Sequence, residues 1–212
     1  MGVSCILLWD HQEGYSTPQA MEMLLKRLEC LGSRSVGTWS MDCESLYPTQ
    51  AVMVAVGNTT PPPRTVHLLH SSEYPKSSFL VLDNFMNCMV ADSSLDAIFS
   101  NLKAFFAPRK GLRIDIKGHY HEVQQYTVKF GSLLFGAISK GVIVEVEDKQ
   151  NTTVSSCWEP LTHFTRGLLH SSQPIERPSM VPPEKEYTPT DSMVNYAYIF
   201  TQLRRVAPTF NK

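Results

Sequence analysis

Residues 126–148, YTVKFGSLLFGAISKGVIVEVED, have the pattern of two β-strands joined by a glycine-containing turn. In the second strand three valines alternate with one isoleucine and two acidic residues: Val142, Val144 and Val146 against Ile143, Glu145 and Glu147. Alternation of this kind is typical of a strand with one face on a core and the other facing water or a partner. Glycines at 136 and 141 mark where the backbone turns. The stretch therefore predicts an antiparallel pair of strands.

Four amphipathic helices are expected around these strands. In the clearest of them Thr17 can act as the N-cap, Pro18 suits the first helical position, and Gly32 lies just beyond the end. The other three are predicted near residues 94–107, 157–170 and 190–203, where apolar side chains recur at helical spacing.

Short apolar segments predict the remaining strands, and their spacing favours an antiparallel meander over parallel βαβ units. They cover residues 3–9, 36–43, 65–70, 78–83, 86–91, 112–117 and 119–130, with a possible short strand at 51–56. Two loop-like insertions are expected near 47–64, which contains Pro61-Pro62-Pro63, and over the proline-rich residues 171–190. We expect one α+β domain over residues 1–212.

Composition excludes several classes of protein. The formal net charge of −1 argues against nucleic-acid binding through a strongly basic surface. No apolar run approaches the roughly 20 residues that span a bilayer, so no membrane association is expected. The five cysteines are scattered and form no CxxC motif, which predicts free thiols in a reducing compartment.

Several residues could take part in catalysis or metal binding, but the further residues that these functions require are not evident in the sequence. His119 and His121 share a strand face and could bind a metal, but no third ligand has matching spacing. Asp42 and Glu44 flank Cys43 and could act as acid and base, although a solvated strand end explains them more simply. Because the common catalytic and nucleotide-binding motifs are missing from the sequence, we predict no catalytic, cofactor or metal site.

An ordered set of short motifs runs through nearly the whole chain. It comprises Met1-Gly2-Val3, Leu24-Leu25, Leu31-Gly32, Asp42-Cys43-Glu44, His70, Ser72-Glu73-Tyr74-Pro75, Phe79, Val128-Lys129, Gly131, Gly141, Val144-Glu145-Val146-Glu147, Cys157-Trp158, Asp191, Met193-Val194, Tyr196 and Phe200. In this order the motifs resemble the subunit 20 family of Mediator, the coactivator complex of RNA polymerase II transcription. The segments near 47–64 and 171–190 do not share the resemblance.

The resemblance implies an open, barrel-like antiparallel sheet flanked by helices. It also implies a non-catalytic, nuclear role in the Mediator head module, as a heterodimer with Mediator subunit 18 next to subunit 8. RNA polymerase II would be an indirect partner, and a link to the TATA-binding protein is attributed to the family. No cofactor, direct nucleic-acid contact or membrane contact is implied.

We place the expected partner surface on the strand face opposite the core valines. It consists of Thr127, Lys129 and Ile143, with Leu133 beside them. Ile143 directs this choice, because an isoleucine among charged neighbours is unusual for a face that meets only water.

Two other functions remain open at this point. A small hydrolase or phosphate-processing enzyme would use scattered carboxylates with His119 and His121 inside the barrel, and requires a charged interior with shifted pKa values. The Mediator interpretation requires an interior of valine, phenylalanine, tyrosine and leucine. A nucleic-acid-binding module is the third possibility, and the net charge disfavours it.

Overall fold

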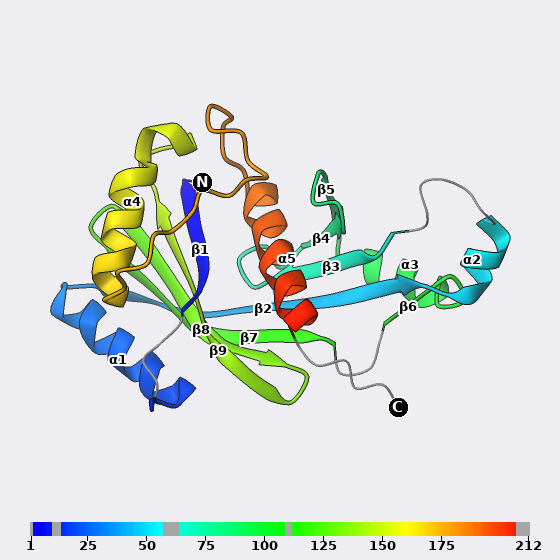
Figure 1. Cartoon of the computed structure of the whole chain (residues 1–212), viewed down its shortest axis with the longest axis horizontal. Coiled ribbons are helices and arrows are strands. Elements are labelled where there is room, and N and C mark those ends of the chain that lie inside the picture. Colours follow the sequence, from blue (N-terminus) through cyan, green and yellow to red (C-terminus); the bar gives the residue numbers. More distant parts are fainter. Residues whose placement is uncertain (1, 10–13, 57–63, 109–111, 207–212) are drawn as a thin grey trace.

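The computed structural model describes residues 2–9, 14–56, 64–108 and 112–206, which form an antiparallel sheet with helices on both faces (Figure 1). The strands are β1 (Val3–Trp9), β2 (Arg34–Pro48), β3 (Val66–Ser71), β4 (Ser77–Leu82), β5 (Cys88–Asp92), β6 (Phe106–Pro108), β7 (Ile114–Val123), β8 (Tyr126–Phe135) and β9 (Ile138–Asp148). The helices are α1 (Thr17–Cys30), α2 (Gln50–Val56), α3 (Leu95–Asn101), α4 (Val154–Leu169) and α5 (Pro189–Val206).

The sheet is open. Its strand order is β1-β9-β8-β7-β2-β3-β4-β5, with β6 pairing with β2 off this path, and every pairing is antiparallel. β1 and β5 stand at the two ends of the order and do not pair with each other. The α+β class is therefore confirmed, with five helices in the described residues where about four were expected, and the barrel comparison holds only loosely.

The stretch that predicted the fold forms β8 and β9. Their register runs from Tyr126 opposite Asp148 to Phe135 opposite Ile138, with an irregularity after Leu133. β9 also pairs with β1, and β8 with β7, so the two strands are interior members of the sheet.

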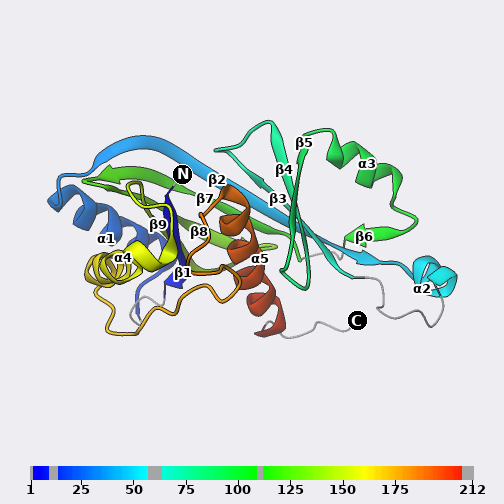
Figure 2. The same ribbon diagram turned by 90° about the horizontal axis from the view of Figure 1, so that it is seen from above.

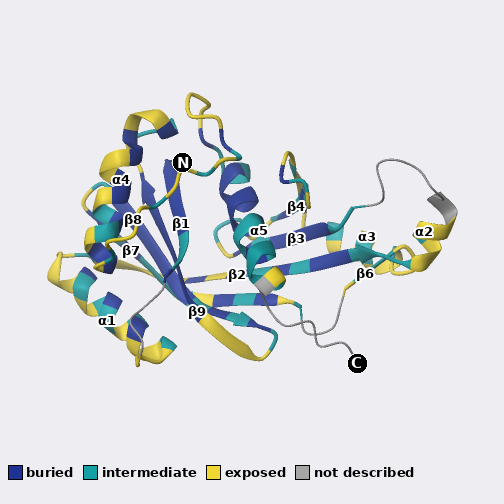
Figure 3. Cartoon of the chain, in the orientation of Figure 1, coloured by how far each residue is buried: buried dark blue, intermediate teal, exposed yellow. Residues whose placement is uncertain are grey.

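Helices cover both faces of this part of the sheet (Figures 1 and 2). α1 and α4 lie on the side of β1, β8 and β9 that carries Val142, Val144 and Val146, and α5 lies on the other side. α5 contacts β1 at one end of the strand order and β3, β4 and β5 at the other. It therefore lies across the opening that the unclosed sheet leaves, and buried residues line β8 and β9 and the inner side of α5 (Figure 3).

Two local predictions are wrong. Residues 51–56, predicted as a strand, lie in helix α2. The helix predicted to reach residue 107 ends at Asn101, and Phe106–Pro108 form β6 opposite Leu46–Pro48 of β2. In the second case a long-range strand pairing overrides the local helical pattern of the apolar residues.

The proline-rich segment before α5 contains no helix or strand, but it is anchored to the fold. Its Val181 and Tyr187 are buried in the core beneath α4, and Glu186 forms an isolated bridge with Thr153. Of the other predicted insertion, residues 57–63 lie outside the described part of the chain. Among the described residues no helix is both long and apolar enough to cross a membrane.

Two glycines should respond in opposite directions to the same substitution. Gly118 lies opposite Gly131, where an added Cβ would stand 1.9 Å from the carbonyl oxygen of Phe130, so backbone must move. We expect Gly118→Ala to destabilise the fold by at least about 2 kcal/mol. At Gly167 in α4 an added Cβ meets nothing within 4 Å, and Gly167→Ala should stabilise by about 0.5–1 kcal/mol. Urea unfolding of both variants tests this, and shifts of the same sign would contradict it.

Candidate interaction surfaces

The four residues predicted to contact a partner lie inside the chain. Thr127 and Lys129 are 2% and 1% exposed, and Leu133 and Ile143 are both 0% exposed. The strand register places them on one face, as expected, but α5 covers that face. The prediction of an exposed face is therefore wrong. Direct contact of these residues with a partner would require α5 to leave the sheet.

The covered face contains a buried charged network centred on Lys129. The ammonium group Nζ lies 2.7 Å from Oε2 of Glu73 and 3.3 Å from Oε2 of Glu145. The Tyr196 hydroxyl on α5 donates to the same Glu145 oxygen at 2.7 Å, and Ser4 Oγ on β1 donates to Oε1 at 2.8 Å. Both oxygens of Glu145 thus have hydrogen-bond donors, as a buried carboxylate requires.

The pKa shifts of Lys129 and Tyr196 keep these two groups of the network in one protonation state. Burial alone would lower the pKa of Lys129, but Glu145 and Glu73 outweigh that effect and raise it above its usual range, so the ammonium stays charged. Burial and the neighbouring Glu145 raise the pKa of Tyr196 well above 10, so its phenol stays neutral and donates. Lys129 and Tyr196 are therefore not poised for proton transfer near neutral pH, while burial raises the pKa of Glu73.

The sheet separates the two sets of residues that a hydrolase would need together. His119 and His121 lie opposite Phe130 and Val128 and share their face, which α1 and α4 cover. Lys129 and Glu145 project from the α5 face. Among the described residues no group of three or more histidine, cysteine or acidic side chains could hold a metal ion. Apolar side chains form a core cluster on each face of the sheet, and the hydrolase interpretation has no support.

Asp42 and Glu44, the other acid–base candidates, line a groove of about 520 Å³ between α3 and strands β2 and β3. His70 of β3 lies there with Nδ1 3.3 Å from Asp42 Oδ2 and Nε2 3.1 Å from Asp96 Oδ1 on α3. Two carboxylates on the two ring nitrogens fit the doubly protonated imidazolium, in which both nitrogens donate. Asp42 also pairs with Arg113 at 3.3 Å, so it is engaged in ion pairs and is not a free base.

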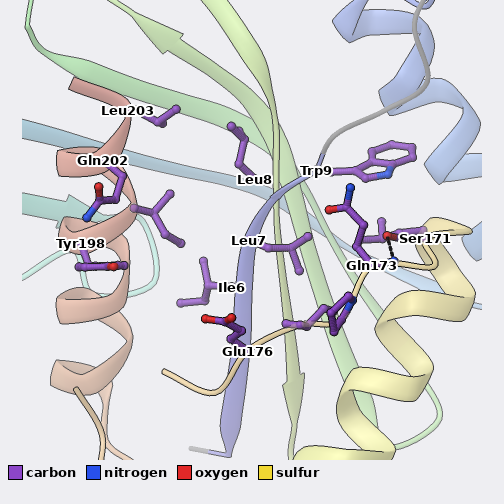
Figure 4. Close-up of a pocket in the computed structure, with 14 residues that line it drawn as sticks. Ile6, Leu7, Leu8, Trp9, Ser171, Gln173, Glu176, Tyr198, Gln202 and Leu203 are labelled. Atoms are coloured by element: carbon purple, nitrogen blue, oxygen red, sulfur yellow. Dashed lines mark hydrogen bonds between the residues drawn. The ribbon is translucent and has the colours of Figure 1, made fainter. Parts of the chain in front are cut away.

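A second groove, of about 440 Å³, follows the outer edge of β1 (Figure 4). Leu8 of β1 and Leu203 of α5 line one part of it, and Gln173 and Glu176 line the opposite part. β1 pairs with β9 on one side and is an end strand of the sheet, so alternate backbone groups point away from the sheet into this region.

Large apolar side chains are exposed in the stretch of chain around the other end strand, β5. They fall between residues 86 and 105: Met86 (73% exposed), Met89 (62%), Val90 (52%), Ile98 (51%) and Phe105 (49%). β5 pairs with β4 alone in the sheet order. A free strand edge with exposed apolar side chains is a site where proteins pair with other chains.

Residues 1–201 match the family model described as the TATA-binding related factor of subunit 20 of the Mediator complex. The chain belongs to the Mediator subunit 20 family. A relative from Homo sapiens, "Mediator of RNA polymerase II transcription subunit 20", is 32% identical over 97% of this chain and 95% of its own length. The protein of the same name from Drosophila melanogaster is 28% identical over 97% of this chain and 87% of its own.

Among solved structures, a conserved hypothetical protein from Pyrococcus furiosus aligns with 84% of this chain and 98% of that chain. The identity is 11% and the TM-score 0.47.

Four of the motifs that carry the subunit 20 resemblance meet at the buried network, although they are far apart in sequence. Glu73 comes from the turn motif before β4, Lys129 from β8, Glu145 from β9 and Tyr196 from α5. Glu147, in the same motif as Glu145, accepts a hydrogen bond from the backbone nitrogen of Gly2 at 2.6 Å. Periodicity could not identify this network, because a lysine and two glutamates alternating with valines are also what a solvated strand face contains.

Removing the cation should test how much the network contributes to the fold. Lys129→Met leaves Glu145 and Glu73 without their buried counter-charge, and we expect a loss of about 3–5 kcal/mol in the free energy of unfolding. Adding Glu145→Gln should restore part of this loss, because an amide costs less to bury unpaired than a carboxylate. Lys117→Met, at an exposed position of β7, is the matched control and should change stability by less than about 0.5 kcal/mol. Equal losses at 117 and 129 would show that the network contributes nothing.

His70 should make the attachment of α3 sensitive to pH. Asp42 and Asp96 raise the pKa of His70 above 6.5 against the effect of burial. Its stabilising contribution is therefore complete below pH 6.5 and is lost as pH rises through the folded-state pKa. No α3 side chain is fully buried, so this helix should exchange its amide hydrogens faster, after correction for intrinsic rates, as pH rises through that value. His70→Gln should remove the dependence, and a variant with the same pH profile as the parent chain would contradict this assignment.

Proposed function

We propose that this protein is a non-catalytic subunit of the nuclear Mediator complex and regulates RNA polymerase II transcription through protein–protein contacts. The observation that carries the proposal is the match of the subunit 20 family over residues 1–201, with curated relatives aligned over 97% of the chain. The geometry is consistent with it, because the buried Lys129 pairs with Glu73 and Glu145 and the sheet separates His119 and His121 from Glu145.

The finer proposal is that residues 1–212 act as one unit of the head module and pair with Mediator subunit 18, next to subunit 8. RNA polymerase II, and through the family the TATA-binding protein, would be indirect partners. The family resemblance supports these partners. The chain's own contribution is surface for association at several separate places: the two end strands and the grooves.

We place the contact with subunit 18 at β5. Met89 and Val90 project from a strand with one free edge, and Met86 and Ile98 are exposed close to it in the chain. A partner that covers these side chains would remove apolar surface from water, which stabilises the complex by about 25 cal/mol per Å² of apolar surface buried. The partner could also pair with the backbone groups on the free edge of β5. The face of the sheet that is buried beneath α5 offers no such edge.

Affinity purification of the tagged full-length chain from nuclear extract tests both levels of the proposal. Stoichiometric recovery of Mediator subunits is expected, with subunits 18 and 8 among them. Recovery of no Mediator subunit would refute the proposed function.

A pair of surface variants separates the β5 contact from membership of the complex. Met89→Glu should reduce recovery of subunit 18 at least about tenfold, because it places a charge in an apolar contact. Ile138→Glu is the matched control, since Ile138 is also a strand residue and is 54% exposed. If both variants capture subunit 18 as the parent chain does, Mediator membership stands and the β5 assignment fails.

A further inference from the structure

A third groove lies where the C-terminal parts of α1 and α4 meet on the outer side of the sheet. Its volume is about 540 Å³, and its lining is Met23, Lys26, Arg27, Cys30 and Leu31 from α1 with His163, Phe164, Gly167, Leu168 and His170 from α4 and its end. Leu31 is 47% exposed, and Met23 and Phe164 are half-buried. The groove therefore has an apolar floor that the chain itself leaves uncovered.

Two features keep the apolar floor of the groove accessible and fix its position. Gly167 lacks a side chain where an added Cβ would meet nothing within 4 Å, so the α4 side of the groove is hollow. Phe164 stacks on Tyr126 of β8 with ring centroids 4.2 Å apart, which holds the aromatic floor against the sheet. An apolar groove between two packed helices has the shape of a site that binds a third helix.

The charged side chains that line the groove are basic, and the Glu22 carboxylate pairs with Lys26 beside the groove. Lys26 and Arg27 line it together with two histidines, and no carboxylate is among the lining residues of the described chain. Arg27 also has a structural role, since its guanidinium donates to the Leu168 carbonyl at 3.0 Å and lies over the Trp9 ring. That role offsets the negative end of α4.

Lys26 and His163 are not assigned a structural role of this kind. Lys26 pairs with Glu22 at 2.8 Å, but both side chains are more than 60% exposed, so the pair is weak and can be exchanged for another carboxylate. His163 is exposed. An acidic ligand can thus reach both side chains without disturbing the packing of α1 on α4.

We propose that the α1–α4 groove binds an amphipathic helix of a partner protein, with apolar residues on one face and acidic residues beside them. The charge of the lining selects an acidic segment over a basic one. A helix is favoured over an extended strand because the groove walls are helices, whose backbone groups are already bonded and offer no edge for pairing. The lining spans α1 from Met23 to Leu31, about 12 Å or two turns, which suits a short helix with apolar residues at i, i+4 and i+7.

This site is independent of the β5 contact. α1 and α4 lie at one end of the molecule, and α3, which follows β5, lies toward the other (Figures 1 and 2). A partner can therefore occupy the groove whether or not subunit 18 is bound at β5.

The probe for this site is a fluorescently labelled synthetic peptide of about four turns, with leucine on one face and glutamate elsewhere. Fluorescence anisotropy with the full-length chain measures its dissociation constant. A peptide with lysine in place of glutamate should bind at least about tenfold more weakly. Gly167→Trp, which fills the hollow, and the double variant Lys26→Glu with His163→Glu should each weaken binding of the acidic peptide about tenfold.

Matched controls separate the groove from general effects of size and charge. Ile138→Trp adds an indole at an exposed position outside the groove, and Lys103→Glu reverses a charge in the groove beside α3; both should leave the dissociation constant within about twofold of the parent value. Circular dichroism confirms that each variant is folded. Equal affinity for the acidic and basic peptides, or unchanged affinity after Gly167→Trp, overturns the proposal. So does a concentration-dependent dimer that Gly167→Trp abolishes, because the groove would then belong to a second copy of the chain.

Discussion

The Glu145 carboxylate contacts side chains from three elements that local sequence patterns do not bring together. It accepts hydrogen bonds from Ser4 on β1 and Tyr196 on α5 and forms the buried ion pair with Lys129 on β8. A buried charge that loses its partner costs several kcal/mol, so alternative positions of β1 or α5 that break these bonds are disfavoured. The apolar contacts of α5 would tolerate small shifts along the sheet, whereas three directional contacts on one carboxylate do not. We infer that the network sets the register in which α5 lies over the open sheet.

The sequence predicts the parts of this fold whose rules are local. The strands from Tyr126 to Asp148 and helix α1 follow from alternation and a helical stripe, and both are confirmed, although the residue that caps α1 is Ser16 and not the expected Thr17. An alternating pattern shows which residues share a face of the sheet, but it does not show whether a helix covers that face. Ile143 and Lys129 share a face as predicted, yet a helix that begins at Pro189 buries it.

The same limit explains the smaller errors. Residues 106–108 form a strand because Leu46–Pro48 are available to pair with them, and that availability depends on the whole sheet. Residues 51–56 are apolar and short, and a run of this kind does not distinguish a strand from a helix. The network escaped prediction for a related reason, since its acidic and basic side chains alternate with valines as on a wet surface, and Tyr196 reaches it from a distant helix.

Covering the second face of the sheet changes where partners can bind. A half-buried sheet would offer one broad face, and the choice of Ile143 rested on that expectation. With α5 in place, the accessible features are the free edges of β1 and β5 and the groove between α1 and α4. The β5 edge lies apart from the α1–α4 groove (Figures 1 and 2), whereas the β1 groove and the α1–α4 groove meet at the end of α4. The strand edges offer backbone groups, and the α1–α4 groove offers an apolar floor with cationic side chains. No residue of the described chain lines both the β1 groove and the α1–α4 groove, so a ligand in one of them does not occupy the residues of the other.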